Sequence, residues 1–200
     1  MSRTVTRSVV VKTGRFDCPV CTRQTGFEHR AVKRYRKVLR VLKVPQGLVG
    51  EHVECDECDT TFHPSVLQGD TDARGSELCK AIRRVMVMMS VADGHLDPTE
   101  VQAMNRIAVD LTGIPFPEDE VNAVLKTVHT EGLPLNPWLR SLMGSLNKSG
   151  RKAVLMAAAG IAAADDKLEV AEVALLNRIA ERLELGKKSV DHTLAQYATP

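Results

Sequence analysis

Two Cys-x-x-Cys pairs constrain the fold of this chain more than any other feature of its sequence. They are Cys18-Pro-Val-Cys21 and Cys55-Asp-Glu-Cys58. A two-residue spacer lets both sulfurs of a pair reach one ion, and two such pairs supply the four ligands of a tetrahedral zinc site. Four thiolates leave no open position on the ion. We therefore expect a structural zinc ion that stabilises a segment too small to fold around its own core.

The 33 residues between the two pairs exceed the usual gap of a zinc ribbon, so they are predicted to contain strands of their own or a long excursion. Residues 45–50 (Pro-Gln-Gly-Leu-Val-Gly) favour a turn, and a strand over residues 51–54 then leads to the second pair. The alternatives to zinc are a thioredoxin-like redox pair, which needs only one Cys-x-x-Cys, and unrelated buried thiols. His63 could replace one sulfur, but with four cysteines present we favour a surface or packing histidine. We assign residues 1–68 to a small β-rich zinc ribbon.

Charge is unevenly distributed along the chain. Residues 1–68 hold 12 Lys and Arg against 7 Asp and Glu, whereas residues 69–200 hold 15 against 18. Seven of the basic residues lie in residues 29–43, which contain Tyr35 and no acid. This basic segment suits a nucleic-acid backbone or an anionic membrane surface. We favour a solvated face of a strand or amphipathic helix, or a surface that docks the acidic helical half.

Beyond residue 74 the apolar residues follow a helical period, which predicts an all-helical domain over residues 74–198. The first stripe, at spacings of three and four, consists of Leu78, Ile82, Val85, Met89 and Ala92. Only 4% of residues are aromatic, which suits close-packed helices better than a β-sandwich. Prolines at first-turn positions help to place the further helices. These are predicted at residues 98–111, 117–130, 137–147, 149–165, 170–184 and 187–198.

Residues 153–164 form the longest apolar run, which is rich in Ala and too short to cross a membrane. Because it is apolar on every side, we expect a central, buried helix whose small residues allow close approach of its neighbours. Cys79 lies beside the first stripe and is expected to be a buried helix thiol. Trp138 is expected to anchor its helix in the core, with a partner-binding role as the alternative.

The helical half contains an internal repeat. Residues 92–108 match residues 164–180 at nine of seventeen positions, which predicts a duplicated helix-loop-helix with halves related by an approximate two-fold axis. Each copy carries three acids at matched positions. These are Asp93, Asp97 and Glu100 in the first copy, and Asp165, Glu169 and Glu172 in the second. Two interpretations stay open: helix caps with favourable dipole interactions, or a second site for Ca²⁺, Mg²⁺ or Mn²⁺.

At these residues the chain resembles the tellurite-resistance TerB-like superfamily, which includes the N-terminal helical domain of the membrane-anchored DjlA co-chaperones. The resemblance rests on Ala-Asp-Gly-x-Leu-x-x-x-Glu at residues 92–100, its echo at 164–172 and the Ala-rich helix before the echo. The first module resembles zinc ribbons fused to some members. The resemblance implies a non-catalytic helical domain with two related halves and suspected metal-binding acids, acting in stress-response assemblies often near membranes. Asp166 replaces the motif glycine in the second copy.

These features predict a non-enzymatic metal-binding and protein-interaction protein. Its protein partners are unknown, and a membrane-associated partner is one option. Nucleic-acid binding through the ribbon and the basic segment is one alternative, and a metal-dependent enzyme using the paired acids is another. No Walker A loop, Gly-x-Ser-x-Gly, His-Glu-x-x-His or dinucleotide motif supports catalysis. The start of the chain lacks the apolar core of a secretory signal, and no transmembrane segment is expected. We therefore expect a cytoplasmic protein.

Overall fold

The structure is a computed structural model, and it groups the chain into two compact units. The first unit comprises Met1–Glu77 and Arg140–Gly150, and the second comprises Leu78–Leu139 and Arg151–Pro200. The residues that the structure describes are 4–38, 42–69, 76–91, 98–131, 135–164, 168, 170–186 and 188–197. We describe each unit by itself.

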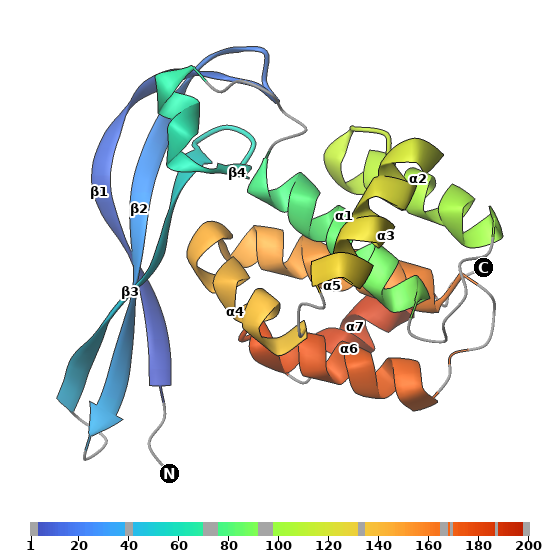
Figure 1. Ribbon diagram of the computed structural model, residues 1–200. Helices are drawn as coiled ribbons and strands as arrows, with labels where there is room; N and C mark the ends of the chain where they lie inside the picture. Colours follow the sequence, from blue (N-terminus) through green and yellow to red (C-terminus); the bar gives the residue numbers. More distant parts are fainter. Residues whose placement is uncertain are drawn as a thin grey trace. The chain divides into compact units, whose positions relative to one another are not determined.

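The first unit is built on one antiparallel sheet with the strand order β1-β2-β3-β4. Its strands are β1 (Thr4–Cys18), β2 (Arg23–Val38), β3 (Leu42–Cys55) and β4 (Thr61–Phe62). The first three strands have 14 to 16 residues and run side by side as a long twisted ribbon (Figure 1). Strands of globular proteins are usually about 5 to 6 residues long, so the ribbon is long enough to extend well beyond the cysteines.

The predicted turn at residues 45–50 is wrong, because these residues lie inside β3. The pairing of β2 with β3 shifts register twice, between Val32 and Lys33 and between Arg34 and Tyr35. Each shift corresponds to a bulge in β3, and Gly47 has the positive φ of 122° that glycine tolerates. The turn-forming residues therefore distort a continuing strand. The predicted strand over residues 51–54 is the second half of β3, and the basic segment contributes to β2 and β3.

The core of the sheet lies at the end that carries the cysteines. Phe16 packs edge-to-face against Phe27 and Phe62, with ring centroids 5.6 and 6.0 Å apart. Val53 and Val66 complete this apolar cluster, together with the buried Cys18 and Cys55. Val66 lies on a short 3-10 helix, η1 (Pro64–Gln68), whose first turn is capped by the exposed His63. This core is small, so the unit depends on further stabilisation.

Seven α-helices follow the sheet in the described part of the chain. They are α1 (Glu77–Ser90), α2 (Pro98–Thr112), α3 (Glu118–Glu131), α4 (Leu135–Ser145), α5 (Lys148–Ala162), α6 (Val170–Arg182) and α7 (Lys188–Tyr197). The predicted mainly helical fold is therefore confirmed, with boundaries that differ by a few residues. The apolar stripe of α1 is buried at Ile82, Val85 and Met89, and Cys79 is a buried helix thiol as expected.

Helix α5 is the buried Ala-rich helix that the sequence predicts. Its residues from Ala157 to Ala162 are all buried. A Cβ atom on Gly160 would lie 2.9 Å from Ile107 of α2 and 3.0 Å from the Tyr197 hydroxyl of α7. The absence of a side chain at Gly160 thus permits α2 and α7 to pack closely on α5.

Trp138 differs from its predicted role as a core anchor. It is half-buried, and the Arg84 guanidinium lies 5.2 Å from its ring centroid, in the range of a cation–π interaction. The next residue, Leu139, is fully buried and takes the core position of α4 instead. A shift of one residue turns a helical side chain by about 100°, which separates the buried leucine from the half-buried tryptophan.

The corner between α4 and α5 belongs to the first unit and packs on β3. A Cβ atom on Gly50 would lie 2.8 Å from the Cα atom of Gly144, so the two backbones touch. His52 donates a hydrogen bond from Nδ1 to the Gly144 carbonyl over 2.8 Å. Asn147 donates from its amide to Glu54 and to the Asp59 carbonyl, at 2.7 and 2.9 Å. The corner is therefore held by polar contacts and by close backbone packing.

Candidate metal centre

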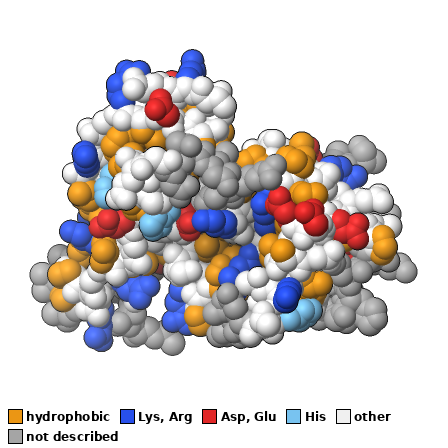
Figure 2. All heavy atoms as spheres, turned by 45° about the horizontal axis from the view of Figure 1, so that its top comes forward, with side chains coloured by type: hydrophobic (Ala, Val, Ile, Leu, Met, Phe, Trp, Pro, Cys, Tyr) orange, Lys and Arg blue, Asp and Glu red, His pale blue; other side chains and the backbone are white. Residues whose placement is uncertain are grey.

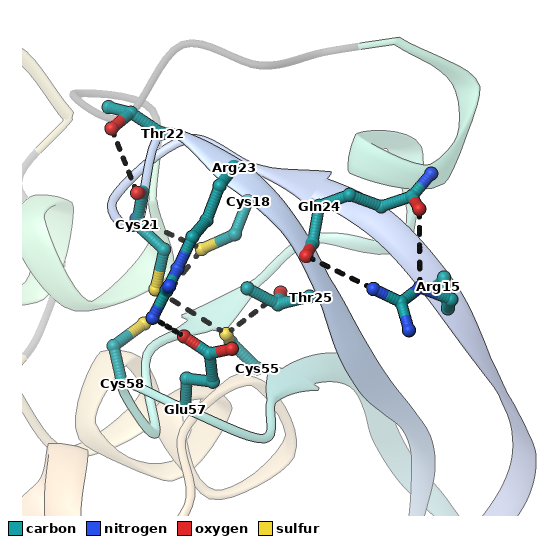
Figure 3. Close-up of polar contacts among 10 residues, drawn as sticks. All are labelled: Arg15, Cys18, Cys21, Thr22, Arg23, Gln24, Thr25, Cys55, Glu57 and Cys58. Atoms are coloured by element: carbon teal, nitrogen blue, oxygen red, sulfur yellow. Dashed lines mark hydrogen bonds and ion pairs between the residues drawn. The ribbon is translucent and has the colours of Figure 1, made fainter.

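Two tight turns bring the four predicted cysteines together (Figure 3). Cys18 ends β1 and Cys55 ends β3, and the second cysteine of each pair lies in the turn that follows. Their four sulfurs all lie within 4.8 Å of one another. The Sγ atoms of Cys18 and Cys58 are 3.9 Å apart, as are those of Cys21 and Cys55. The four cysteines are the one group of potential metal ligands among the residues that the structure describes.

These distances match a metal site and exclude disulfides. A disulfide bond joins sulfurs about 2 Å apart, about half of the distances found here. Four sulfurs at about 2.3 Å from a central ion, on the corners of a tetrahedron, lie about 3.8 Å apart. The sulfur cluster thus has the dimensions that a tetrahedral zinc ion requires.

The two turns have the same backbone geometry. The N–H of Thr22 donates to the Cys18 carbonyl over 2.9 Å, and the N–H of Asp59 donates to the Cys55 carbonyl over 3.1 Å. Thr22 and Asp59 both have a positive φ, 52° and 54°, which lets each turn close within four residues. The Cys21 N–H also points at the Cys18 sulfur, 3.4 Å away. Such N–H groups stabilise the negative charge of a thiolate.

Side chains of the sheet complete the surroundings of the sulfurs. The buried Thr25 hydroxyl lies 3.3 Å from the Cys55 sulfur. Arg23 at the start of β2 forms an ion pair of 2.6 Å with Glu57 of the second turn (Figure 3). Both members of this pair are exposed, so it contributes little stability. The Thr25 contact, in contrast, is shielded from water and orients a ligand.

The environment shifts the pKa values of the thiols in different directions. Burial raises the pKa of Cys18 to about 11 and also raises the pKa of Cys21. Burial acts in the same direction on Cys55, but hydrogen bonds from Thr25 and from the N–H groups of Cys58 and Glu57 outweigh it and lower its pKa. Four adjacent thiols cannot all ionise without a compensating positive charge. A divalent cation at their centre would supply that charge.

The predicted acidic sites lie mostly outside the described residues. This applies to Asp93, Asp97, Asp165 and Glu169. Glu100 and Glu172 lie in the first turns of α2 and α6, the ends where acids complement the helix dipole. The matched helices also bury matched residues, namely Met104 and Leu176, Ile107 and Ile179, and Ala108 and Ala180.

Sequence reasoning missed several residues around the metal centre. Thr25, His52 and Asn147 carried no motif that marks a site. Asn147 precedes α5 and its side chain accepts a hydrogen bond from the Gly150 N–H over 2.8 Å, as an N-cap residue does. An Asn before an Ala-rich helix is a recognisable capping signal, but the predicted helix over residues 137–147 included it.

These features define a protein with a four-cysteine module in a small antiparallel sheet, which fits a zinc ribbon, joined to a seven-helix domain. The family model described as tellurite resistance protein TerB matches residues 80–194, and the chain belongs to this family. Comparison with the curated proteins and with the solved structures gave no match. Within the described residues, none of the helices has the length and apolarity needed to cross a membrane.

Proposed function

We propose that Cys18, Cys21, Cys55 and Cys58 hold one structural zinc ion. The observation that carries this proposal is the approach of four sulfurs to within 4.8 Å of one another at the ends of two hairpins with equivalent turns. Because all four positions are thiolates, the site is closed and favours a structural over a catalytic ion. Soft sulfur ligands in a tetrahedral arrangement select zinc or iron over magnesium and calcium.

Elemental analysis of protein purified without added metal tests this proposal. We expect about one zinc ion per chain, and its loss in Cys18→Ser. Cys79→Ser is the matched control, because it removes a buried thiol from α1 and should keep the zinc. Iron in place of zinc, or equal zinc content in the two variants, would contradict the proposal.

We further propose that the protein is a non-enzymatic, cytoplasmic protein-interaction component of a stress-response assembly. Membership of the TerB family supports this role, and thiolate ligands suit a reducing compartment. We propose residues 1–68 as the metal module and residues 74–198 as the helical domain, in agreement with the family match over 80–194. Lower survival on tellurite when the gene is deleted, restored by the wild-type chain but not by Cys18→Ser, would support the stress-response role.

The second divalent-cation site stays a prediction. It would use Asp93, Asp97, Glu100, Asp165, Glu169 and Glu172. A calcium- or manganese-dependent rise in melting temperature that is lost in Asp93→Ala/Asp165→Ala would favour a cation site over helix caps, because a ligand of the native state stabilises it.

A further inference from the structure

The end of the sheet far from the cysteines carries strong positive charge and no core. We call it the distal ribbon and define it as residues 4–10 of β1, 33–36 of β2 and 43–49 of β3. None of these residues is buried. They include Arg7, Lys33, Arg34, Arg36 and Lys43, and no Asp or Glu. A three-stranded sheet usually needs an apolar face or a packing partner for stability, so this half of the ribbon has the properties of a surface that an anionic partner covers.

One face of the distal ribbon places hydroxyl groups beside guanidinium groups. In the pairing of β1 with β2, Thr4 lies opposite Arg36 and Thr6 lies opposite Arg34. Directly opposed residues of antiparallel strands project from the same face. On the β3 side, Arg34 lies opposite Gly47, which has no side chain to cover it. Arginine and threonine side chains are common donors to phosphate oxygens.

The other face is basic as well. Arg7 lies directly opposite Lys33, and Val5 lies opposite Tyr35. Like charges at directly opposed positions destabilise a sheet, and an anion bound beside them would remove this cost. Positive charge therefore lies on both faces of the β1–β2 pair.

Nearer the cysteines, two basic residues of the same sheet lie beside acids. Arg30 forms ion pairs with Glu28 and, at 3.1 Å, with Glu54. His29 lies 3.0 Å from Glu51. The sequence has no acid between Glu28 and Glu51 and none before Asp17, so the three strand segments of the distal ribbon contribute basic residues and no acid.

Positive charge on both faces of the β1–β2 pair favours some kinds of anionic partner over others. A membrane surface or an acidic helix would meet only one face of the ribbon, whereas the major groove of DNA has a phosphate backbone on each side. This groove is about 12 Å wide and 8.5 Å deep and admits a two-stranded ribbon, while the major groove of duplex RNA is too narrow. Figure 2 shows one face of the molecule, on which Lys and Arg side chains lie among apolar and uncharged atoms.

We propose that the β1–β2 edge of the distal ribbon enters the major groove of double-stranded DNA. Strand β1 is the outer strand of the sheet and leads into the groove. Arg34 and Arg36 face one phosphate backbone, and Arg7 and Lys33 face the other. Val9 and Val10 of β1 are 45% and 41% exposed and lie at the leading edge, where they contribute apolar contacts. Because most contacts go to phosphates, binding is strongly dependent on salt and weakly dependent on sequence.

Fluorescence anisotropy with a labelled DNA duplex of about two helical turns tests the proposal on the full, zinc-containing chain. The test variant is Arg7→Gln/Arg34→Gln/Arg36→Gln. We expect at least about tenfold weaker binding at moderate salt, and a plot of log affinity against log salt that is less steep by about 2 to 3, since each phosphate contact contributes about 0.9 to this slope. Each single Arg→Gln variant should show about a third of the change in slope.

The matched control is Arg106→Gln/Lys126→Gln/Arg178→Gln, which removes the same charge from exposed positions of α2, α3 and α6. It should bind DNA nearly as well as the wild type. The proposal is overturned if the wild type does not bind the duplex at low salt, or if control and test variants lose equal affinity. Binding to phosphatidylserine vesicles in place of DNA, lost in the test variant, would also overturn it. Zinc content and melting temperature measured on the same samples keep this result separate from that for the metal centre.

Discussion

His52 is a buried ionisable side chain whose protonation opposes folding. Its side chain is 1% exposed, and Nδ1 donates to the Gly144 carbonyl, which leaves Nε2 as the unprotonated nitrogen of a neutral ring. In the described part of the chain Nε2 has no hydrogen-bond partner. Burial lowers the pKa of His52 below 6.5 and outweighs the hydrogen bond to Gly144 and the charge of Glu54, which raise it. Arg30 and His29 add smaller effects that lower the pKa further.

We therefore predict that His52 makes the protein less stable in mild acid. Below pH 6.5, the pKa of an exposed histidine, the unfolded chain binds a proton that the native His52 does not. The free energy of unfolding then falls with decreasing pH, by up to about 1.4 kcal/mol per pH unit, until the native pKa is reached. Above pH 6.5 the contribution is complete.

Urea unfolding at several pH values, compared between the wild type and His52→Gln, measures this effect. Glutamine can donate to Gly144 but does not titrate, so the variant should lose less stability than the wild type between about pH 7 and pH 5.5. His63→Gln is the control, since His63 is exposed and precedes η1. Equal pH dependence of wild type and His52→Gln would contradict the prediction.

At the scale of elements, Asn147 joins the second cysteine turn to helix α5. Its Oδ1 atom caps α5 by accepting from the Gly150 N–H, and its amide group donates to Glu54 and to the Asp59 carbonyl. Asp59 follows Cys58 directly. The Asn147 side chain therefore provides a hydrogen-bond acceptor for the first turn of α5 and a donor for the backbone of the second cysteine turn.

Two substitutions separate these roles. Asn147→Ala removes the cap and both donors, so we expect a loss of about 2 to 3 kcal/mol in the free energy of unfolding. Asn147→Asp keeps an oxygen that can cap α5 but loses both donors and adds a negative charge beside Glu54. We expect Asn147→Asp to lose stability as well, by a smaller amount, in chemical denaturation at neutral pH. Wild-type stability of Asn147→Asp would show that the contacts to Glu54 and Asp59 contribute nothing.

The helices could be predicted from sequence because periodicity and proline positions are local signals. The convergence of the four cysteines could be predicted for the same reason, because each Cys-x-x-Cys pair is a local motif. The lengths of β1 and β3 could not be predicted from the sequence. Pro45 and Gly47 are typical turn residues, and only the pairing with β2 shows that they lie inside a strand. The hydrogen bond between His52 and Gly144 joins residues 92 positions apart, so no local sequence pattern could predict it.

At the scale of the whole molecule, the division into units does not follow the chain. The second unit is interrupted by Arg140–Gly150, which belong to the first unit with the sheet and its cysteines. Helix α5 starts in this segment and continues into the second unit, where its residues from Ala157 to Ala162 are all buried. The first turn of α5 thus belongs to the unit that holds the four cysteines, and the rest of the helix belongs to the other unit.

We predict that zinc removal loosens the start of α5 together with the sheet. Without the ion the sulfurs separate, the turn at Cys58 opens and the Asp59 carbonyl is no longer held against Asn147, which weakens the cap of α5. Hydrogen exchange measured by mass spectrometry should accelerate after chelation in β1 to β3 and at residues 146–152, while α6 and α7 keep their protection. Zinc added back should restore the original rates. Faster exchange in the sheet with unchanged rates at residues 146–152 would mean that Asn147 does not transmit the state of the metal site, whereas equal acceleration in α6 and α7 would mean that the whole chain unfolds as one unit.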